Sequence, residues 1–209
     1  MTLNNTYPKL VEKFRELSQK RKHAIQERQA RLTLGPSVIR VFAKGTNDMV
    51  RPLLERIELD DLTKLDGQAE YKRWFEKNLH RIAKKILVLN NKIDRPGIHP
   101  GYKWGHSSKI MNSFIEGIVR QSRYFTDSEA KRIESWLYVP LDSVVMRELR
   151  DCGVATPKTV NGIASGSQFY GLQEKMGRAA ACAGVSRILF DDVWASNRKN
   201  GASKNRQEE

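Results

Sequence analysis

The sequence predicts an all-α protein of about eight helices, and three observations lead to that class. Apolar residues recur at spacings of three and four along most of the 209-residue chain, which is the period of an amphipathic helix. The alternation that is typical of strands is confined to one short stretch, Val38–Ala43. Glycine and proline cluster between the periodic segments, where they end helices. We therefore expect a single helical domain over residues 1–195, in one lobe or two, and a disordered basic tail over residues 196–209.

Three helices are expected in the N-terminal half. The first runs from residue 7 to residue 34, has a long exposed polar stretch, and ends at Gly35-Pro36. The second spans residues 46–57 and is capped at Thr46 or Asn47. The third spans residues 68–91 and has the clearest pattern, because its apolar residues repeat at three and four over five turns.

The C-terminal half is divided by recognisable breaks. Residues 94–105 hold two prolines and three glycines and are expected to form a loop, so the fourth helix begins at His106 or Ser107. The fifth begins with a capping box over residues 126–129. The sixth is capped by Asp142 or Ser143, and Gly153 ends it. The segments expected to be helical here are residues 106–119, 126–137, 144–150, 169–183 and 185–194.

The charge of the chain points to a phosphate-bearing partner. The chain has 37 Lys and Arg residues and 24 Asp and Glu residues, which gives a net charge of +13. The last fourteen residues hold four basic and two acidic side chains, which leaves +11 on the rest of the chain. A compact domain with this self-repulsion commonly binds nucleic acid, so we expect double-stranded DNA as the partner. We expect a cytoplasmic monomer without a membrane partner, because the start of the chain is polar and no apolar run approaches 18 residues.

Several classes of enzyme are disfavoured. The sequence contains no nucleotide-binding glycine motif, no HExxH and no GxSxG. The four histidines are scattered, and two cysteines, Cys152 and Cys182, are too few for a four-thiolate site, so we expect neither a metal nor another cofactor. The acidic pairs Asp60-Asp61 and Asp191-Asp192 have no obvious partners, and we interpret both as solvated helix ends.

Two residues are candidates for catalysis. Lys109 is expected in the first turn of a helix, where the positive partial charge of the N-terminus favours the neutral amine that a nucleophile requires. Asp142 follows Pro140 and is expected at an N-cap, where a carboxylate accepts backbone N–H bonds and stays ionised. Taken singly, Lys109 is typical of a surface lysine and Asp142 of a structural cap.

Taken together, the two segments resemble a known family. Residues 138–149, YVPLDSVVMREL, are similar to the V-P-V-D-x-x-V/M helix start of the helix–hairpin–helix DNA glycosylases, and residues 109–115, KIMNSFI, resemble the helix that carries the family's lysine. The resemblance covers residues 100–195 and implies that Lys109 is a Schiff-base nucleophile and Asp142 the catalytic carboxylate. The usual hairpin, L-P-G-V-G-x-K, is absent, and Asp142 follows Lys109 by 33 residues. A modified hairpin and a longer separation are features of the archaeal 8-oxoguanine glycosylase branch, which is therefore the nearer comparison.

Further residues are candidates for contacts with DNA. Trp104 is expected on the loop, where it either stacks on a flipped base or anchors the loop in the core. His106 either binds a base edge or caps the helix, and Asn112 lies one turn after Lys109 and can support it. The candidates for binding phosphate are Lys103, Arg120, Arg123, Arg147 and Lys158.

The sequence therefore predicts a DNA glycosylase, with or without lyase activity. The base that it releases stays open between oxidised guanine and a hypermodified base of phage DNA, such as glucosylated hydroxymethylcytosine, removed in antiviral defence. Two other classes also stay open: a basic helical module that binds DNA without chemistry, and a helical adaptor whose charge serves an acidic protein. Salt-dependent DNA binding distinguishes these two alternatives.

Overall fold

The computed structural model describes residues 7–39, 42–90 and 104–193, and in these ranges the chain is all-α, as the sequence predicts. The eight α-helices there are α1 (Pro8–Thr33), α2 (Pro36–Ile39), α3 (Thr46–Glu55), α4 (Gln68–Asn90), α5 (Trp104–Glu116), α6 (Asp127–Glu134), α7 (Ser143–Asp151) and α8 (Gly166–Cys182). Short 3₁₀ turns are η2 (Leu59–Lys64), η4 (Val160–Gly162) and η5 (Arg187–Asp192), and α5 continues into a π-helical turn, η3 (Gly117–Gln121). None of the helices in the described ranges combines the length and apolar character that a membrane span requires.

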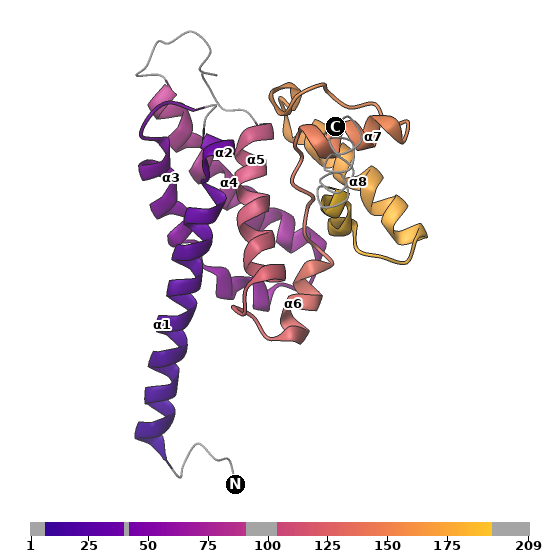
Figure 1. The fold of residues 1–209 in the computed structure, drawn as a ribbon. Coiled ribbons are helices and arrows are strands. Elements are labelled where there is room, and N and C mark those ends of the chain that lie inside the picture. The colour runs from indigo at the N-terminus through magenta and orange to yellow at the C-terminus, as the bar shows by residue number, and fades with distance from the viewer. Residues whose placement is uncertain (1–6, 40–41, 91–103, 194–209) are drawn as a thin grey trace, which may run out of the picture.

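Helix α5 is the central element of the fold. It lies between a group formed by α1, α3 and α4 and a second group formed by α7 and α8 (Figure 1). Ile110, Met111, Phe114 and Ile115 are completely buried, which agrees with the apolar face that the sequence predicts for this segment. Because α5 contacts both groups, side chains on α5 can meet residues from either half of the chain.

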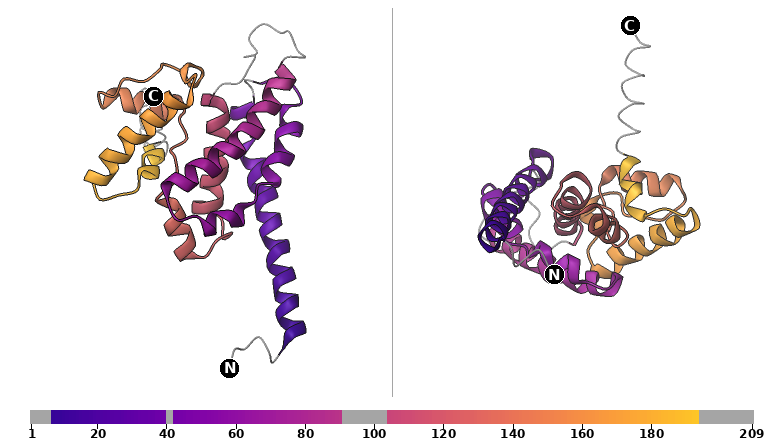
Figure 2. Two further views of the ribbon diagram at one scale, coloured as in Figure 1. Left: turned by 180° about the vertical axis from the view of Figure 1, so that it is seen from behind. Right: turned by 90° about the horizontal axis from the view of Figure 1, so that it is seen from below.

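Within the described residues, helix α1 is docked through its C-terminal half. The amide nitrogen of Gln26 donates to the carbonyl oxygens of Leu54 and Ile57, both at 2.9 Å. Lys22 lies 2.7 Å from a carboxylate oxygen of Asp60. The part of α1 that precedes Lys22 extends away from the other helices (Figure 1, Figure 2).

The beginning of α5 differs from the prediction. The helix starts at Trp104 rather than at residue 106 or 107, so Trp104 and Gly105 are helical, not part of the loop. The N–H of Gly105 donates to the carbonyl oxygen of Ile163 at 3.1 Å, and a Cβ on Gly105 would lie 2.0 Å from the carbonyl oxygen of Val160. Contacts with residues more than 50 positions later therefore stabilise a first turn that the local sequence disfavours. The remainder of the expected loop, residues 94–103, lies outside the described residues.

Other predicted boundaries also differ, among them the start of α8 at Gly166 rather than residue 169 and the N-cap of α3 at Gly45 rather than Thr46 or Asn47. Residues 36–39 are helical, although Val38–Ala43 is the one stretch with a strand-like pattern. Helix α6 ends at Glu134, three residues before the predicted end at Leu137. In the last predicted helix, 185–194, residues 187–192 form a 3₁₀ turn. By contrast, the capping box at Thr126, the N-cap at Asp142 and the left-handed Gly153 are all confirmed.

Candidate functional site

Lys109 and Asp142, which the sequence singles out 33 residues apart, lie together in the structure. The Nζ atom of Lys109 is 3.8 Å from Oδ2 of Asp142. The lysine side chain is 23% exposed and the aspartate side chain 5% exposed, so the pair is mostly shielded but open to solvent on the lysine side. The arrangement brings an amine and a carboxylate to one partly solvated point, beside the central helix.

Asp142 is fixed by its role as the N-cap of α7. Its Oδ1 atom accepts hydrogen bonds from the N–H groups of Val144 at 2.9 Å and of Val145 at 3.0 Å. One carboxylate oxygen is thus used for capping, while the other is directed toward Lys109. Aspartate is a favourable N-cap residue, and here the capping hydrogen bonds to Oδ1 also fix the direction of Oδ2.

The segment that leads into Asp142 is held from α8 and η5. The side-chain amide of Gln173, which is buried, accepts from the N–H of Val139 at 2.9 Å and donates to its carbonyl oxygen at 2.8 Å. Arg187 donates to the carbonyl oxygens of Trp136 at 2.7 Å and Leu137 at 2.6 Å. These contacts satisfy an extended backbone inside the protein and fix the position of the aspartate.

Lys109 does not occupy the position that the sequence argument assumed. Because α5 begins at Trp104, Lys109 is its sixth residue and lies in the second turn rather than the first. The positive partial charge of a helix N-terminus is concentrated in the first turn, so this part of the argument for a neutral amine is wrong. Proximity to Asp142 is the feature that distinguishes Lys109 from an ordinary surface lysine.

A second charged cluster lies at the end of α5, where Glu116 meets Arg120 of η3 and the acidic pair of η5, and it was missed by the sequence analysis. Arg120 donates to Glu116 at 2.7 Å and to both carboxylate oxygens of Asp192 at 3.1 and 3.2 Å. The Glu116 side chain is only 8% exposed. Asp191 forms a side-chain hydrogen bond with Glu116 and also experiences the charge of Asp142.

Burial and the neighbouring carboxylates change the protonation of this cluster. Burial, followed by the negative charges of Glu116 and Asp142, raises the pKa of Asp191 well above the usual carboxyl range. Burial also raises the pKa of Glu116, although Arg120 opposes the shift. A shared proton between Asp191 and Glu116 fits these directions, because a buried carboxylate and a half-buried one in hydrogen-bond contact do not both ionise easily.

Both acidic pairs lie at helix ends, as expected, and the side chains of Asp60, Asp61 and Asp192 are 45%, 42% and 56% exposed. The expectation that the pairs lack partners is wrong. Asp192 is bound by Arg120, and Asp191 contacts Glu116. Asp60 pairs with Lys22 at 2.7 Å, and Asp61 pairs with Lys64 at 2.9 Å. The sequence signal that could have found the cluster is the i, i+4 pair Glu116–Arg120 on the buried α5, because charges there need partners.

The aromatic candidate Trp104 is partly buried and packs against the core from the start of α5 rather than from a loop. Its ring stacks on Phe169 with centroids 6.3 Å apart, and it meets Tyr170 edge-on at 5.8 Å. A Cβ on Gly166 would lie 2.8 Å from the indole, so α8 approaches the ring closely. The structure thus favours the anchoring role of Trp104. The rings of Trp74 and Phe75 are buried, as expected, and Trp136 is partly buried against the same core.

Of the other candidates near Lys109, Asn112 is the most unusual. Its side chain is 1% exposed, and neither the amide oxygen nor the amide nitrogen has a hydrogen-bond partner among the residues that the structure describes. His106 is half-buried and meets the ring of Phe42 edge-on, with centroids 5.5 Å apart. A buried amide without partners is costly, and its place one turn after Lys109 makes it a candidate for contact with a substrate.

The predicted phosphate-binding residues fall into two groups. Arg123, Arg147 and Lys158 are exposed, and Arg147 lies 4.0 Å from a carboxylate oxygen of Glu148. Arg120 is 20% exposed and forms ion pairs with two carboxylates, so its guanidinium is less available to a phosphate than those of the exposed residues. Lys103 lies outside the described residues.

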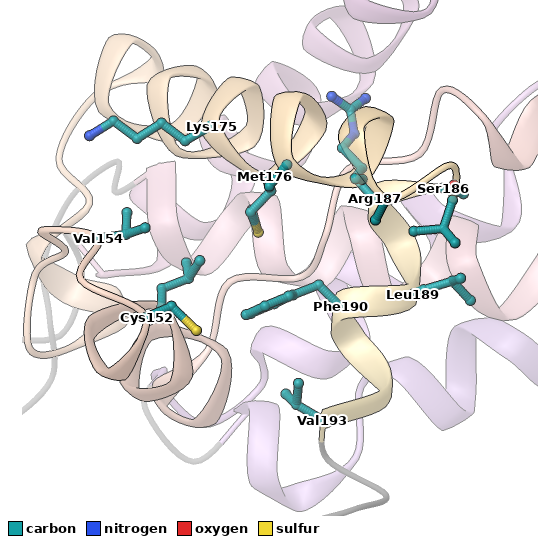
Figure 3. A pocket seen from close by; sticks show the side chains of 14 residues that line it. Cys152, Val154, Lys175, Met176, Ser186, Arg187, Leu189, Phe190 and Val193 are labelled. Carbon is teal, nitrogen blue, oxygen red and sulfur yellow. The ribbon is translucent and has the colours of Figure 1, made fainter.

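An apolar pocket of about 460 Å³ lies between α7, α8 and η5 (Figure 3). Met176, Leu189 and Phe190 contribute to its lining, whereas Lys109 and Asp142 do not. The η5 turn contacts two different parts of the protein. Phe190 lines this pocket, whereas Asp191 and Asp192 contact the charged cluster formed with Glu116 and Arg120.

Comparison with protein-family models, curated proteins and solved structures finds no match for this chain.

Proposed function

We propose that this protein is a DNA glycosylase that uses Lys109 and Asp142 to release a damaged or modified base. One observation carries the proposal: the lysine amine lies 3.8 Å from a carboxylate oxygen whose partner oxygen is fixed by two backbone N–H groups. An amine beside an oriented carboxylate is the pair that cleavage of an N-glycosidic bond through a covalent sugar intermediate requires. The net charge of +13 supports DNA as the substrate.

The reaction starts with a base rotated out of the duplex, because the sugar is not accessible within the stack. Positive charge develops on the deoxyribose as its bond to the base weakens, and the Asp142 carboxylate stabilises that charge. Lys109, having lost its proton, donates its electron pair to C1′ while the base leaves with the electrons of the broken bond and takes up a proton. Proton loss from the lysine nitrogen and opening of the bond between C1′ and O4′, with a proton taken up by O4′, gives the Schiff base.

Strand cleavage is a consequence of that intermediate. The Schiff base acidifies the C2′ proton, and its removal expels the 3′-phosphate by β-elimination. The exposed Arg123, Arg147 and Lys158 are proposed to hold flanking phosphates, and Asn112 to contact the rotated nucleotide. The candidate substrates remain oxidised guanine and a hypermodified phage base such as glucosylated hydroxymethylcytosine.

Borohydride trapping tests the proposal directly. The protein is incubated with a panel of duplexes that carry different modified bases, and borohydride is added during the reaction. With the correct base we expect a covalent protein–DNA adduct, which Lys109→Gln should lose. Lys131→Gln, at an exposed lysine of α6, is the matched control and should retain the adduct.

The other outcomes separate the alternatives. Base release without an adduct would mean that water is the nucleophile and that Asp142 assists it. If the protein binds DNA but neither releases a base nor forms an adduct with any duplex of the panel, it is a non-catalytic basic DNA-binding module and not an enzyme.

A further inference from the structure

The free end of α1 carries a row of exposed apolar side chains. Leu10, Phe14 and Leu17 are 53%, 63% and 50% exposed, and Tyr7, which caps the helix, is 63% exposed. Large apolar residues are scattered singly on most protein surfaces, but these four follow one another along one edge of a single helix. Figure 1 and the left view of Figure 2 show this half of α1 extending beyond the other helices.

The spacing of the row is that of a coiled-coil seam. Positions 7, 10, 14 and 17 follow the 3-4-3 pattern of heptad positions a and d, so their side chains form one narrow line along the helix. A helix that lies on a membrane presents a much broader apolar face. Here the neighbouring positions are mostly polar or charged, which favours another helix as the partner.

The row is also pre-formed. An isolated helix of four turns is unstable in water, but this one continues into a segment held by Gln26 and Lys22. The entropy of ordering the binding helix is therefore already lost before a partner arrives, which favours association.

The charges beside the row identify the partner's chemistry. Residues 7–21 hold five basic and two acidic side chains. Lys13 and Lys20 occupy the heptad g positions, which lie next to the seam and pair with charged residues of the facing helix. In an antiparallel pair of two copies the Lys13 side chains would face each other, so charge opposes self-association in that orientation, and in a parallel pair Lys13 would face Ser18 and gain no ion pair. Glutamates on the facing helix would instead meet both lysines.

We propose that the free half of α1 is a docking surface for an acidic amphipathic helix of another protein. The partner's apolar seam covers Leu10, Phe14 and Leu17, and its acidic flanks contact Lys13 and Lys20. This surface is separate from the Lys109–Asp142 site and does not depend on the proposed reaction.

A designed peptide serves as the probe. It has three heptads with leucine at every a and d position and glutamate at every e and g position, and a fluorophore reports binding to the full-length protein by anisotropy. Phe14→Ser should weaken binding about tenfold or more, because it removes a large apolar side chain from the centre of the seam. Gln19→Ala, on the opposite face of α1, is the matched control and should bind as the unaltered protein does.

Charge reversal provides the second arm. The double variant Lys13→Glu and Lys20→Glu should lose the acidic peptide and bind a peptide with lysine at the e and g positions. Equal binding of acidic and basic peptides by the unaltered protein would overturn the proposal, as would failure to bind the acidic one. Sedimentation that shows a dimer lost in Phe14→Ser would assign the row to a second copy. Binding of phosphatidylglycerol vesicles, lost in the same variant, would assign it to a membrane surface.

Discussion

Replacing Asp142 by alanine should lower the free energy of unfolding by about 2 kcal/mol, whereas replacement by asparagine should cost less than about 1 kcal/mol. The alanine variant removes the acceptor for the N–H groups of both Val144 and Val145. Loss of an N-cap typically costs about 1 kcal/mol and reaches about 2. The upper value applies here because Val145 is completely buried, so water cannot replace the lost acceptor.

Asparagine keeps an oxygen at the Oδ1 position and loses only the charge. The lost terms are the attraction to the helix dipole and the pairing with a partly exposed Lys109, and each is worth about 0.3–0.5 kcal/mol at such a site, so their sum stays below about 1 kcal/mol. For a chain of this size the alanine variant should melt roughly 4–8 °C lower. Thermal unfolding followed by circular dichroism measures both differences.

The same two variants separate structure from chemistry. If the carboxylate stabilises charge on the sugar, both variants should lose base release, although the asparagine protein remains nearly as stable as the unaltered one. A folded Asp142→Asn protein that still releases the base would reduce Asp142 to a helix cap. Equal destabilisation by alanine and asparagine would show that the charge, rather than the capping oxygen, supports α7.

Three further predictions follow from charge, burial and packing. Affinity for a DNA duplex should fall about 100-fold between 50 and 200 mM salt, as expected for neutralisation of roughly four phosphates, and an affinity that does not change would exclude DNA as the partner. The pKa of Asp191 is raised in the folded protein, so the folded protein keeps a proton that the unfolded chain releases above about pH 4. The free energy of unfolding should therefore decrease between about pH 4 and neutral pH. Asp191→Asn should remove that decrease, so the variant should be more stable than the unaltered protein by about 1–2 kcal/mol at pH 7 but not at pH 4. Urea unfolding at several pH values measures the difference, and the same pH dependence in both proteins would contradict the raised pKa of Asp191. Gly105→Ala should cost about 3 kcal/mol, since its Cβ would lie 2.0 Å from a backbone oxygen of Val160, while Gly117→Ala meets only the movable Gln29 side chain and should cost much less.

Local signals account for the parts of the fold that the sequence predicts. Helix α4 begins at Gln68 and ends at Asn90, close to the predicted limits, because its boundaries follow from periodicity and composition. The caps at Thr126 and Asp142 depend on residues within three positions of the helix start. Asp142 could be recognised for the same reason.

Contacts between distant segments account for the parts that could not be predicted. Arg120 and Asp192 are 72 positions apart, and no pattern in either segment indicates that they meet. The first turn of α5 depends on contacts of Gly105 with Ile163 and Val160, and the sequence around Gly105 gives no sign of these contacts. The 3.8 Å separation of Lys109 and Asp142 is likewise a tertiary property, and the sequence could only suggest the pair through resemblance.

The clamp that Arg187 forms on residues 136 and 137 has a consequence for synthesis on the ribosome. Its guanidinium reaches the carbonyl oxygens of Trp136 and Leu137 from about 50 residues later in the chain. Chains are made from the N-terminus, so α1 to α4 can assemble while this later segment is still inside the ribosome. The backbone before Asp142 acquires its last hydrogen bonds only after Arg187 has emerged. The candidate catalytic pair is therefore among the last features of the nascent protein to form.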